Sequence, residues 1–336
     1  MFNESMSVYQ TQVSCHKNRL IKRLIPVVLS VLVLAMSVLP VFAASPSKTV
    51  SASASLAYNI KGLKHNLAVQ KFYIASTYLY VTQRSGGTVY LSRCLMNGSD
   101  ATYVDEMTLN NCGHGQTLDM YTYNNINYLY VSSKADSSTT YYWSLQVARL
   151  QYEAGATYDY TDLHRFTYMN YANKTGSSLG TTYRVDGGGN STYTVFRVQT
   201  TAGTVTYSIY NTVALNQLLD SNEQVQMNSA AAVSACVNSF TQSGDSIVRP
   251  NSSFQGIDMI DNTKIYVAGG GEGQTPQIAL MSNTGAYNTL VKITNVGTHE
   301  IEGVQTKDSK VYFNIVSDPT NKTDTQKIYY VSDSIF

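Results

Sequence analysis

A short sequence pattern returns along this chain at the start of successive units, and it constrains the fold more than any other feature. Gln116-Thr-Leu-Asp-Met120 recurs 139 positions later as Gln255-Gly-Ile-Asp-Met259. In both places a turn follows, and then an apolar strand pattern at residues 127–131 and 264–267. Self-similarity of this kind is the signature of a repeat architecture, in which each unit buries its faces against its neighbours.

Relaxed copies of the pattern mark three further units. They begin at Gln70, Thr182 and Glu302, and each precedes a strand pattern, followed by a polar loop and one or two more strands. The sequence therefore predicts an all-β fold, a five-bladed β-propeller of antiparallel three- to four-stranded blades that forms a single domain over residues 62–336. A β-sandwich or a β-helix is the alternative, but a sandwich would not require the same pentapeptide to return.

Three segments depart from the repeat. Residues 45–57 are small and polar and are interpreted as a flexible linker, and the region 45–61 could also contribute a strand that closes the ring. A short helical insertion is predicted near 212–240, because leucines and an Ala-rich run replace the strand alternation there. Two glycine triplets, at 187–189 and 269–271, are interpreted as hairpin turns.

The first 44 residues have the order of parts of a secretory signal peptide. Residues 17–23 carry four basic side chains, residues 24–39 form an apolar run, and small residues follow up to Ala44. The run is shorter than the ~20 apolar residues that a membrane helix needs, so cleavage after Ala43 or Ala44 is predicted rather than a membrane anchor. The protein is expected to be secreted and extracellular, with no transmembrane segment in the mature chain.

Removal of this segment changes the charge balance. It holds four of the 23 Lys and Arg residues and one of the 22 Asp and Glu residues, so the formal net charge of +1 becomes −2. The mature chain therefore has no global positive field, and nucleic acid is not an expected partner. The 27 tyrosines suit half-buried strand surfaces. Of the cysteines outside the signal, Cys94 and Cys112 are the closer pair for one disulfide, and Cys236 is the third.

The repeated polar position supplies the candidate site. If the first strand of each blade lines a central channel, the polar side chains that begin the units gather near the axis, with two histidines close before two of them. The predicted binding site is a polar ring at one channel mouth, made of Gln70, His114, Gln116, Thr182, Gln255, His299 and Glu302. The alternative is that these side chains only satisfy strand ends and channel waters.

The sequence gives little support for a catalytic or a metal-binding site. The sequence has no Cys-x-x-Cys motif, a serine hydrolase is not predicted, and no cofactor or metal site is predicted. His299 and Glu300 with Glu302 could form a metal pair or an acid/base site, and Asp119 recurs as Asp258, but the sequence does not give the separation that a glycosidase pair requires. No catalytic residue is assigned, and whether the protein is a cell-wall lytic enzyme stays open.

Several segments, taken in order, resemble the helveticin J-like family, the large heat-labile class III bacteriocins of lactic acid bacteria. They run from Gly113 to the C-terminal region and cover most of the mature chain: residues 113–117, 143–150, 162–170, 205–211, 253–258 and 299–304. The resemblance implies a propeller-like fold and a role in killing related Gram-positive bacteria at the cell wall. The apparent signal peptide and the Ala-rich insertion depart from the family pattern.

Three functions follow as hypotheses. The first is a secreted antibacterial protein that acts on the cell envelope of related Gram-positive bacteria. The second is a non-catalytic lectin-like propeller, and the expected partners in either case are bacterial cell-wall components or surface glycans of target cells. The third is a glycan-cleaving enzyme, for which Glu302 is the first residue to test.

Overall fold

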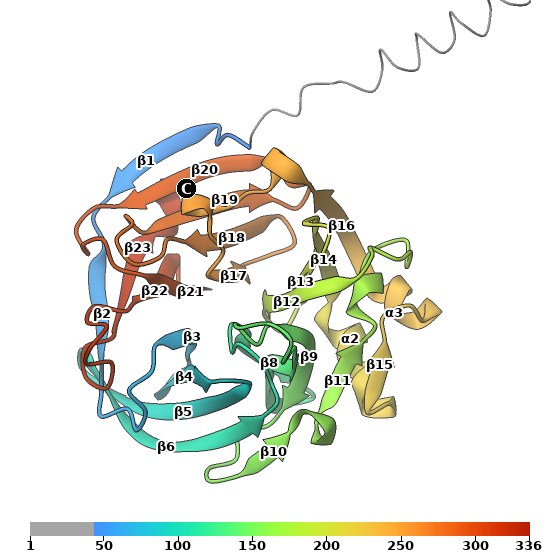
Figure 1. Cartoon of the computed structure of the whole chain (residues 1–336), viewed down its shortest axis with the longest axis horizontal. Helices are drawn as coiled ribbons and strands as arrows, with labels where there is room; N and C mark the ends of the chain where they lie inside the picture. Colours follow the sequence, from blue (N-terminus) through green and yellow to red (C-terminus); the bar gives the residue numbers. More distant parts are fainter. Residues whose placement is uncertain (1–43) are drawn as a thin grey trace, which may run out of the picture. The chain divides into compact units, whose positions relative to one another are not determined.

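The computed structural model describes residues 44–336, so the predicted signal peptide lies outside the described residues apart from Ala44. The described part is all-β with few helices, as the sequence predicts. Its sheets are arranged around a common centre (Figure 1), which is a β-propeller-like architecture.

Local sequence explains why the strands form and where they turn. Tyr, Val, Ile and Thr fill the strands, and such side chains suit a pleated, half-buried surface. Asn124 and Asn125 form the two-residue turn between the first two strands of one sheet, with φ of 51° and 61°. Asp308 and Ser309 do the same elsewhere, with φ of 50° and 56°. Positive φ at both central residues is the requirement of a type I′ hairpin.

The strands assemble into four hydrogen-bonded sheets. One sheet contains, in spatial order, β17 (Gly256–Met259), β18 (Lys264–Gly269), β19 (Gln277–Ser282), β20 (Tyr287–Ile293) and β1 (Lys48–Ala52). Another contains β12 (Thr182–Gly189), β13 (Tyr193–Thr200), β14 (Val205–Asn211) and β16 (Cys236–Gln242). A third contains β7 (Leu118–Tyr123), β8 (Ile126–Ala135), β9 (Ser144–Leu150), β11 (His164–Thr167) and β15 (Gln224–Gln226).

The fourth sheet has nine strands and two antiparallel halves. The first half contains β3 (Val69–Ile74), β4 (Tyr78–Ser85), β5 (Thr88–Asn97) and β6 (Asp100–Asn110), with β10 (Thr157–Asp159) beside β6. The second half contains β21 (Ile301–Lys307), β22 (Lys310–Ile315), β23 (Lys327–Ser332) and β2 (Ser55–Lys61). A short parallel pairing of β2 with β6 joins the halves.

Five strands contact one another in a closed ring around the centre. β3 contacts β7 and β21, β12 contacts β7 and β17, and β17 contacts β21. Each of these inner strands starts an antiparallel run of at least four strands that extends outward, as Figure 1 shows. The inner strands run in the same sense, because the contacts between neighbours advance together. Gly256 lies against Gly303 and Asp258 binds Thr306. On the other side of β21, Gly303 lies against Lys71 and Gln305 binds Ile74. Their first residues therefore meet at one mouth of the ring and their last residues at the other.

The hydrophobic core lies between neighbouring sheets rather than at the centre. It divides into separate clusters, each built from two adjacent strand runs. Phe72 and Val81, for example, pack with Ile328 from the other half of the nine-stranded sheet. Full burial of one such side chain contributes ~1.5–3 kcal/mol, so each sheet is stable mainly through its neighbours. Short 3-10 helices of the described residues lie in the connections at Tyr160–Asp162, Met169–Tyr171, Gly244–Ser246 and Pro250–Ser252, and another, Asp333–Ile335, follows the last strand.

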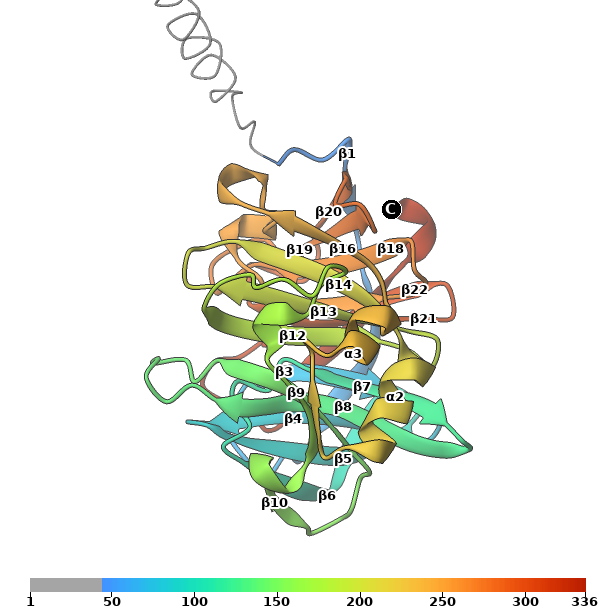
Figure 2. The same ribbon diagram turned by 90° about the vertical axis from the view of Figure 1, so that its right-hand side faces the viewer.

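The predicted helical insertion contains two short helices, α2 (Thr212–Ser221) and α3 (Ala230–Ala235). The side chain of Asn211 accepts a hydrogen bond from the Ala214 amide and caps α2. Leu215 and Leu219, one helical turn apart, are buried in the adjacent core cluster. Figure 2 shows both helices on the outer side of the sheets. Residues 236–239, at the end of the predicted insertion, belong to strand β16 instead.

Residues 45–57 do not form the flexible linker that their composition suggested. Residues 48–52 are strand β1, which pairs in parallel with β20, and residues 55–61 are strand β2. β2 pairs antiparallel with β23, the last strand, so segments near both ends of the described chain share one sheet. Backbone hydrogen bonding explains the correction, because it holds β1 at the edge of its sheet and β2 between β23 and β6 without a regular apolar alternation.

The glycine triplet at 187–189 is not a hairpin turn. All three residues lie within β12 and pair with residues 194–196 of β13. A Cβ on Gly188 would lie 2.8 Å from the carbonyl oxygen of Ile257 on the neighbouring inner strand. Glycine is needed here because two backbones approach closely. Of the second triplet, Gly269 ends β18 and the other two residues lie in the connection to β19.

The predicted disulfide between Cys94 and Cys112 does not form. Both thiols are free and buried, and so is that of Cys236. Cys94 lies on β5 and Cys112 follows β6 of the same strand run, but their side chains are buried in different core clusters. Burial raises the pKa of Cys94 to about 12, so this thiol behaves as a small apolar side chain. In residues 44–336, no helix has the length and apolar character to cross a membrane.

Candidate functional site

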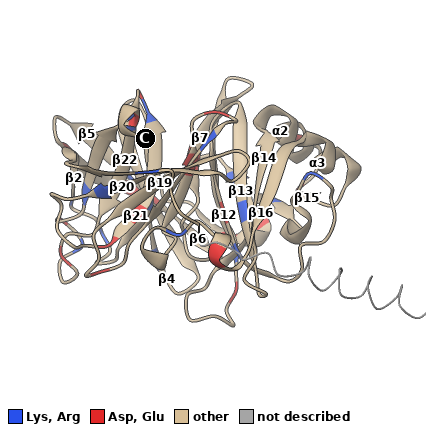
Figure 3. Ribbon diagram, turned by 90° about the horizontal axis from the view of Figure 1, so that it is seen from above, with Lys and Arg blue, Asp and Glu red and all other residues tan. Residues whose placement is uncertain are grey.

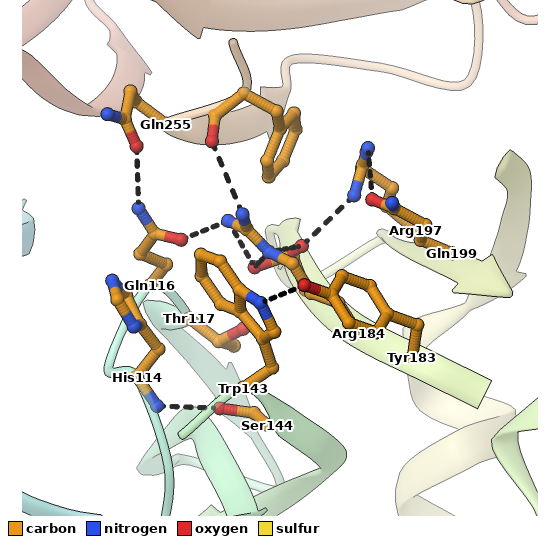
Figure 4. A network of polar contacts seen from close by, with 12 residues as sticks. His114, Gln116, Thr117, Trp143, Ser144, Tyr183, Arg184, Arg197, Gln199 and Gln255 are labelled. Carbon is orange, nitrogen blue, oxygen red and sulfur yellow. Dashed lines mark hydrogen bonds and ion pairs between the residues drawn. The ribbon is translucent and has the colours of Figure 1, made fainter. Parts of the chain in front are cut away.

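Three of the predicted ring residues come together at the first mouth of the ring. Gln116 lies two residues before inner strand β7, Gln255 directly precedes β17, and Glu302 is the second residue of β21. The Gln116 Nε2 donates to Gln255 Oε1 and to Glu302 Oε2, at 3.1 Å in each case. The Gln255 Nε2 donates to Glu300 Oε1 at 3.2 Å. Figure 4 shows the Gln116 and Gln255 amides facing each other.

The centre of this cluster is Arg184, a residue that the sequence pattern did not single out. Its Nη2 donates to Gln116 Oε1, and its Nη1 donates to the Phe254 carbonyl oxygen at 3.4 Å. Its Nε donates to Asp186 Oδ2 at 2.8 Å. The guanidinium also lies over the ring of Trp143, 4.0 Å from its centroid. Arg184, on β12, thus connects this strand to the residues that precede β7 and β17 (Figure 4).

A second buried arginine completes the charge balance behind Arg184. The Arg197 Nη1 lies 3.4 Å from Asp186 Oδ2, and the Arg197 guanidinium lies 3.8 Å from the centroid of Phe254. One carboxylate therefore faces two guanidinium groups in the described structure. Burial lowers the pKa of Arg184, and the negative charge of Asp186 opposes that shift. Buried charges of this kind are stable only when they are paired and hydrogen-bonded.

An aromatic stack borders the polar cluster. The His114 ring lies 4.3 Å from that of Trp143, and Trp143 stacks on Tyr141 with centroids 5.1 Å apart. The Trp143 Nε1 donates to the Tyr183 hydroxyl at 2.9 Å. The stack leads from the buried His114 to the exposed Tyr141, whose exposed fraction is 54%. The stack therefore exposes an aromatic ring to solvent at its outer end.

Two titratable groups of the cluster, His114 and Glu302, are driven toward their neutral forms. Burial, reinforced by the positive charges of Arg184 and Arg84, lowers the pKa of His114 to about 3. The His114 Nδ1 lies 2.7 Å from the Tyr141 carbonyl oxygen, which fixes the ring. Burial, and then the negative charge of Glu300, raises the pKa of Glu302 well above its usual value. In their neutral forms, the imidazole and the carboxyl act in the cluster as hydrogen-bonding groups rather than as charges.

The other predicted ring residues lie outside this network. Gln70 is buried near the start of β3, and its Nε2 donates only to the nearby Ala68 carbonyl oxygen at 3.4 Å. His299 faces Glu272, with 3.6 Å between Nδ1 and Oε1, rather than Glu302. Thr182 begins β12, where a bulge shifts the register before Arg184. The bulge explains why Arg184 takes the place expected for Thr182.

Sequence reasoning missed Arg184, Asp186 and Trp143. A signal was present, since a charged pair with i, i+2 spacing in an otherwise uncharged strand is unusual in a chain with 13% charged residues. Figure 3 shows how thinly the charged residues are scattered over the described structure. No group of three or more His, Cys, Asp or Glu side chains within residues 44–336 is arranged to hold a metal ion.

Solved structures resemble this chain only weakly. A GH43_1 enzyme from Xanthomonas citri is 9% identical with a TM-score of 0.39, and the match covers 83% of this chain and 90% of that one. The WD40 domain of Toxoplasma gondii coronin is 11% identical with a TM-score of 0.33, over 82% of this chain and 74% of that one. No curated protein matches the chain at a significant level.

Family membership is clear by contrast. The sequence model of one protein family, described as "Bacteriocin helveticin-J", matches residues 48–334. The match includes all of the inner strands and every residue of the mouth cluster described above. The chain belongs to the helveticin J bacteriocin family.

Proposed function

We propose that this chain is an exported antibacterial protein that acts at the cell envelope of related Gram-positive bacteria. The family match over residues 48–334 is the observation that carries the proposal. The predicted signal peptide adds a route out of the producing cell. The low share of charged residues, 13%, suits a protein that works outside the cell.

The fold that supports this function is, in our proposal, a five-bladed propeller. The five mutually contacting inner strands and the strand runs that extend from them support that count. Under this count, β2 and β23 lie in one blade, so that segments from both ends of the described chain close the ring. Closure of this kind leaves only short strand edges exposed.

The direct test of the proposed function is growth inhibition. Purified mature protein is spotted on lawns of a broad panel of related Gram-positive strains, with heat-denatured protein as the control. The proposal expects clear zones on some strains that depend on dose. Absence of inhibition across the panel at every dose would contradict it.

A second function, glycan binding without catalysis, is favoured by the aromatic stack at the first mouth. Tyr141 offers an exposed ring that stacks on Trp143. Trp143 in turn lies against Arg184, the partner of Gln116. Ligand sites combine an apolar face with a few fixed polar groups in this way. The test is sedimentation of the protein with whole target cells. Tyr141→Ala is expected to reduce the bound fraction, whereas Tyr168→Ala, at an exposed tyrosine outside the cluster, is the matched control.

A further inference from the structure

The opposite ends of the inner strands border two adjoining cavities that the mouth cluster does not use. One has a volume of about 610 Å³ and the other about 590 Å³. Both are lined by Tyr73, Ser191 and Lys307, so the two cavities meet at these residues. Tyr73 and Lys307 lie toward the ends of β3 and β21, whereas Gln70 and Glu302 lie at their beginnings. The cavities therefore belong to the second mouth of the ring.

The first cavity has a fixed aromatic wall. Tyr78 and Tyr152 hold the Arg93 guanidinium between them, with distances of 4.6 and 5.1 Å to their ring centroids. Arg93 forms a two-point ion pair with Asp105, at 3.0 and 2.5 Å. The Tyr152 hydroxyl donates to the same carboxylate at 2.7 Å. These contacts lock the rings in place before any ligand arrives, which lowers the entropic cost of binding.

The second cavity contains a buried carboxylate with unused hydrogen-bonding capacity. Asp119 is 1% exposed and lines the cavity, and its carboxylate accepts no hydrogen bond of ordinary length, although the Gly189 backbone amide and Lys71 interact with it. The Lys71 Nζ lies 3.7 Å from Asp119 Oδ2, within ion-pair reach but beyond hydrogen-bond distance. Its hydrogen bonds go instead to the carbonyl oxygens of Ile257 and Val304, at 2.8 and 2.7 Å. A ligand hydroxyl would satisfy the open acceptors.

The repeat partner of Asp119 behaves differently. Asp258 also lines the second cavity, but its Oδ2 accepts from the Thr306 amide at 2.5 Å and from the Thr306 hydroxyl at 2.9 Å. Burial raises the pKa of both carboxyls above the usual range. Buried polar atoms without a close hydrogen-bond partner are rare in native proteins. Asp119 interacts only with Lys71 and the Gly189 amide at longer range, so it is the carboxyl of the pair with capacity left for a ligand.

We propose that these two cavities form one groove that binds an oligosaccharide chain. Its tyrosines offer flat apolar faces, and its hydroxyl, amide and carboxylate groups offer hydrogen bonds to sugar hydroxyls. Single ligand pockets of ~300–1,000 Å³ hold one drug-sized molecule, so two adjoining cavities of this size fit a chain of several sugars. The inference extends the proposed envelope function by naming a ligand class, at a site distinct from the mouth cluster.

Calorimetric titration with soluble oligosaccharides of increasing length tests the groove. The probes are series built from N-acetylglucosamine, from glucose and from xylose, and a cell-wall stem peptide that carries no sugar. We expect at least one sugar series to bind, with affinity that rises with chain length until both cavities are filled. Failure of every series to bind, or binding of the stem peptide alone, would overturn the proposal.

Two variants locate the site. Tyr78→Ala in the first cavity and Asp119→Asn in the second should each weaken binding by about fivefold, as the loss of one ring contact or one hydrogen bond does. Tyr168→Ala, at an exposed tyrosine outside both cavities, should leave binding unchanged. Should Asp119→Asn fail to fold, Tyr78→Ala still decides the question, and unchanged affinity in that variant would place the binding elsewhere.

The outcome is separable from that of the growth-inhibition test. Protein that inhibits growth but binds no oligosaccharide would overturn the groove and leave the antibacterial function standing. Protein that binds oligosaccharides through Tyr78 but inhibits no strain would overturn the antibacterial function and leave the groove standing.

Discussion

The Gln116 Nε2 lies 3.1 Å from Gln255 Oε1, although 139 residues separate these side chains in the chain. They occupy the same position of the same pentapeptide in two repeats. A repeat that closes into a ring brings equivalent positions together at the centre, and this hydrogen bond is the direct structural expression of that closure. Arg184, Glu302 and the aromatic stack are built around it.

Removal of the Arg184 guanidinium should destabilise the fold. Arg184→Met leaves the buried Asp186 with one guanidinium partner fewer and leaves Gln116 Oε1 without its donor. The loss of one partner of a buried ion pair costs ~3–5 kcal/mol. Urea unfolding should show a decrease of that size in the free energy of unfolding. The exposed Arg249→Met is the control, and equal stability of the two variants would refute the central role of Arg184.

His114 should make the protein sensitive to acid. Its pKa is about 3 in the folded state, mainly through burial, and near 6.5 in an unfolded chain. Between these values the unfolded state binds the additional proton, so stability is full above about pH 6.5 and falls as the pH decreases, by up to ~1.4 kcal/mol per pH unit. His114→Phe, which retains a ring against Trp143, should reduce this slope. Unfolding measured between pH 4 and 7, with His299→Phe as control, checks it; equal slopes would contradict it.

Glu302 should have the opposite effect to His114 on the pH dependence of stability. Its pKa is raised well above its usual value in the folded state, mainly through burial. The folded state therefore retains the proton longer, so the stabilisation is full below the unfolded pKa of ~4.3 and is lost as the pH rises through the folded pKa. Glu302→Gln keeps an acceptor for Gln116 and should gain stability relative to the wild type as the pH increases.

The free energy of unfolding of the wild type and of Glu302→Gln, measured from pH 4.5 to 8, checks this prediction. The exposed Glu223→Gln serves as the matched control. A difference between Glu302→Gln and wild type that does not change with pH would show that this carboxyl ionises equally in both states. Glu302→Gln also addresses lysis, because loss of cell-wall digestion in this variant alone would make Glu302 a candidate acid.

The close approach of inner strands should be intolerant of a single methyl group. A Cβ on Gly256 would lie 2.7 Å from the Cα of Gly303 on β21. Overpacking of this kind costs ~1–3 kcal/mol, because the neighbouring backbone has to shift. Gly256→Ala should therefore lower the melting temperature, whereas Gly271→Ala, which meets only the Gln274 side chain at 3.9 Å, should not. Equal melting temperatures would mean that the ring of inner strands is looser than described.

The sequence predicted the strands well because their information is local. Alternation and turn residues placed the first strands of the repeats within two residues of their observed starts, and the repeat identified Gln116, Gln255 and Glu302 as neighbours. It did not predict Arg184, because a β-bulge before that residue changes the register, and a bulge leaves little trace in one sequence. Composition also misled for residues 45–57, since pairing at a sheet edge depends on backbone groups.

The groove at the second mouth could not be predicted from the sequence for a different reason. Asp119 and Asp258 are equivalent positions of the repeat. Only the structure shows that Thr306 donates hydrogen bonds to Asp258, whereas Asp119 has no close hydrogen-bond donor. The partners of a buried side chain come from other repeats, at long sequence separation. Hydrogen-bond satisfaction is therefore a property of the assembled ring.

The central claim is that this member of the helveticin J family kills related bacteria at their envelope. The measurement that tests it most directly is the viable count of a sensitive-strain panel after exposure to purified mature protein, with Arg184→Met and heat-denatured protein beside it. The account predicts that viable counts fall with dose for the folded wild type and recover when the fold is lost. Unchanged counts for every strain at every dose of folded protein would contradict it.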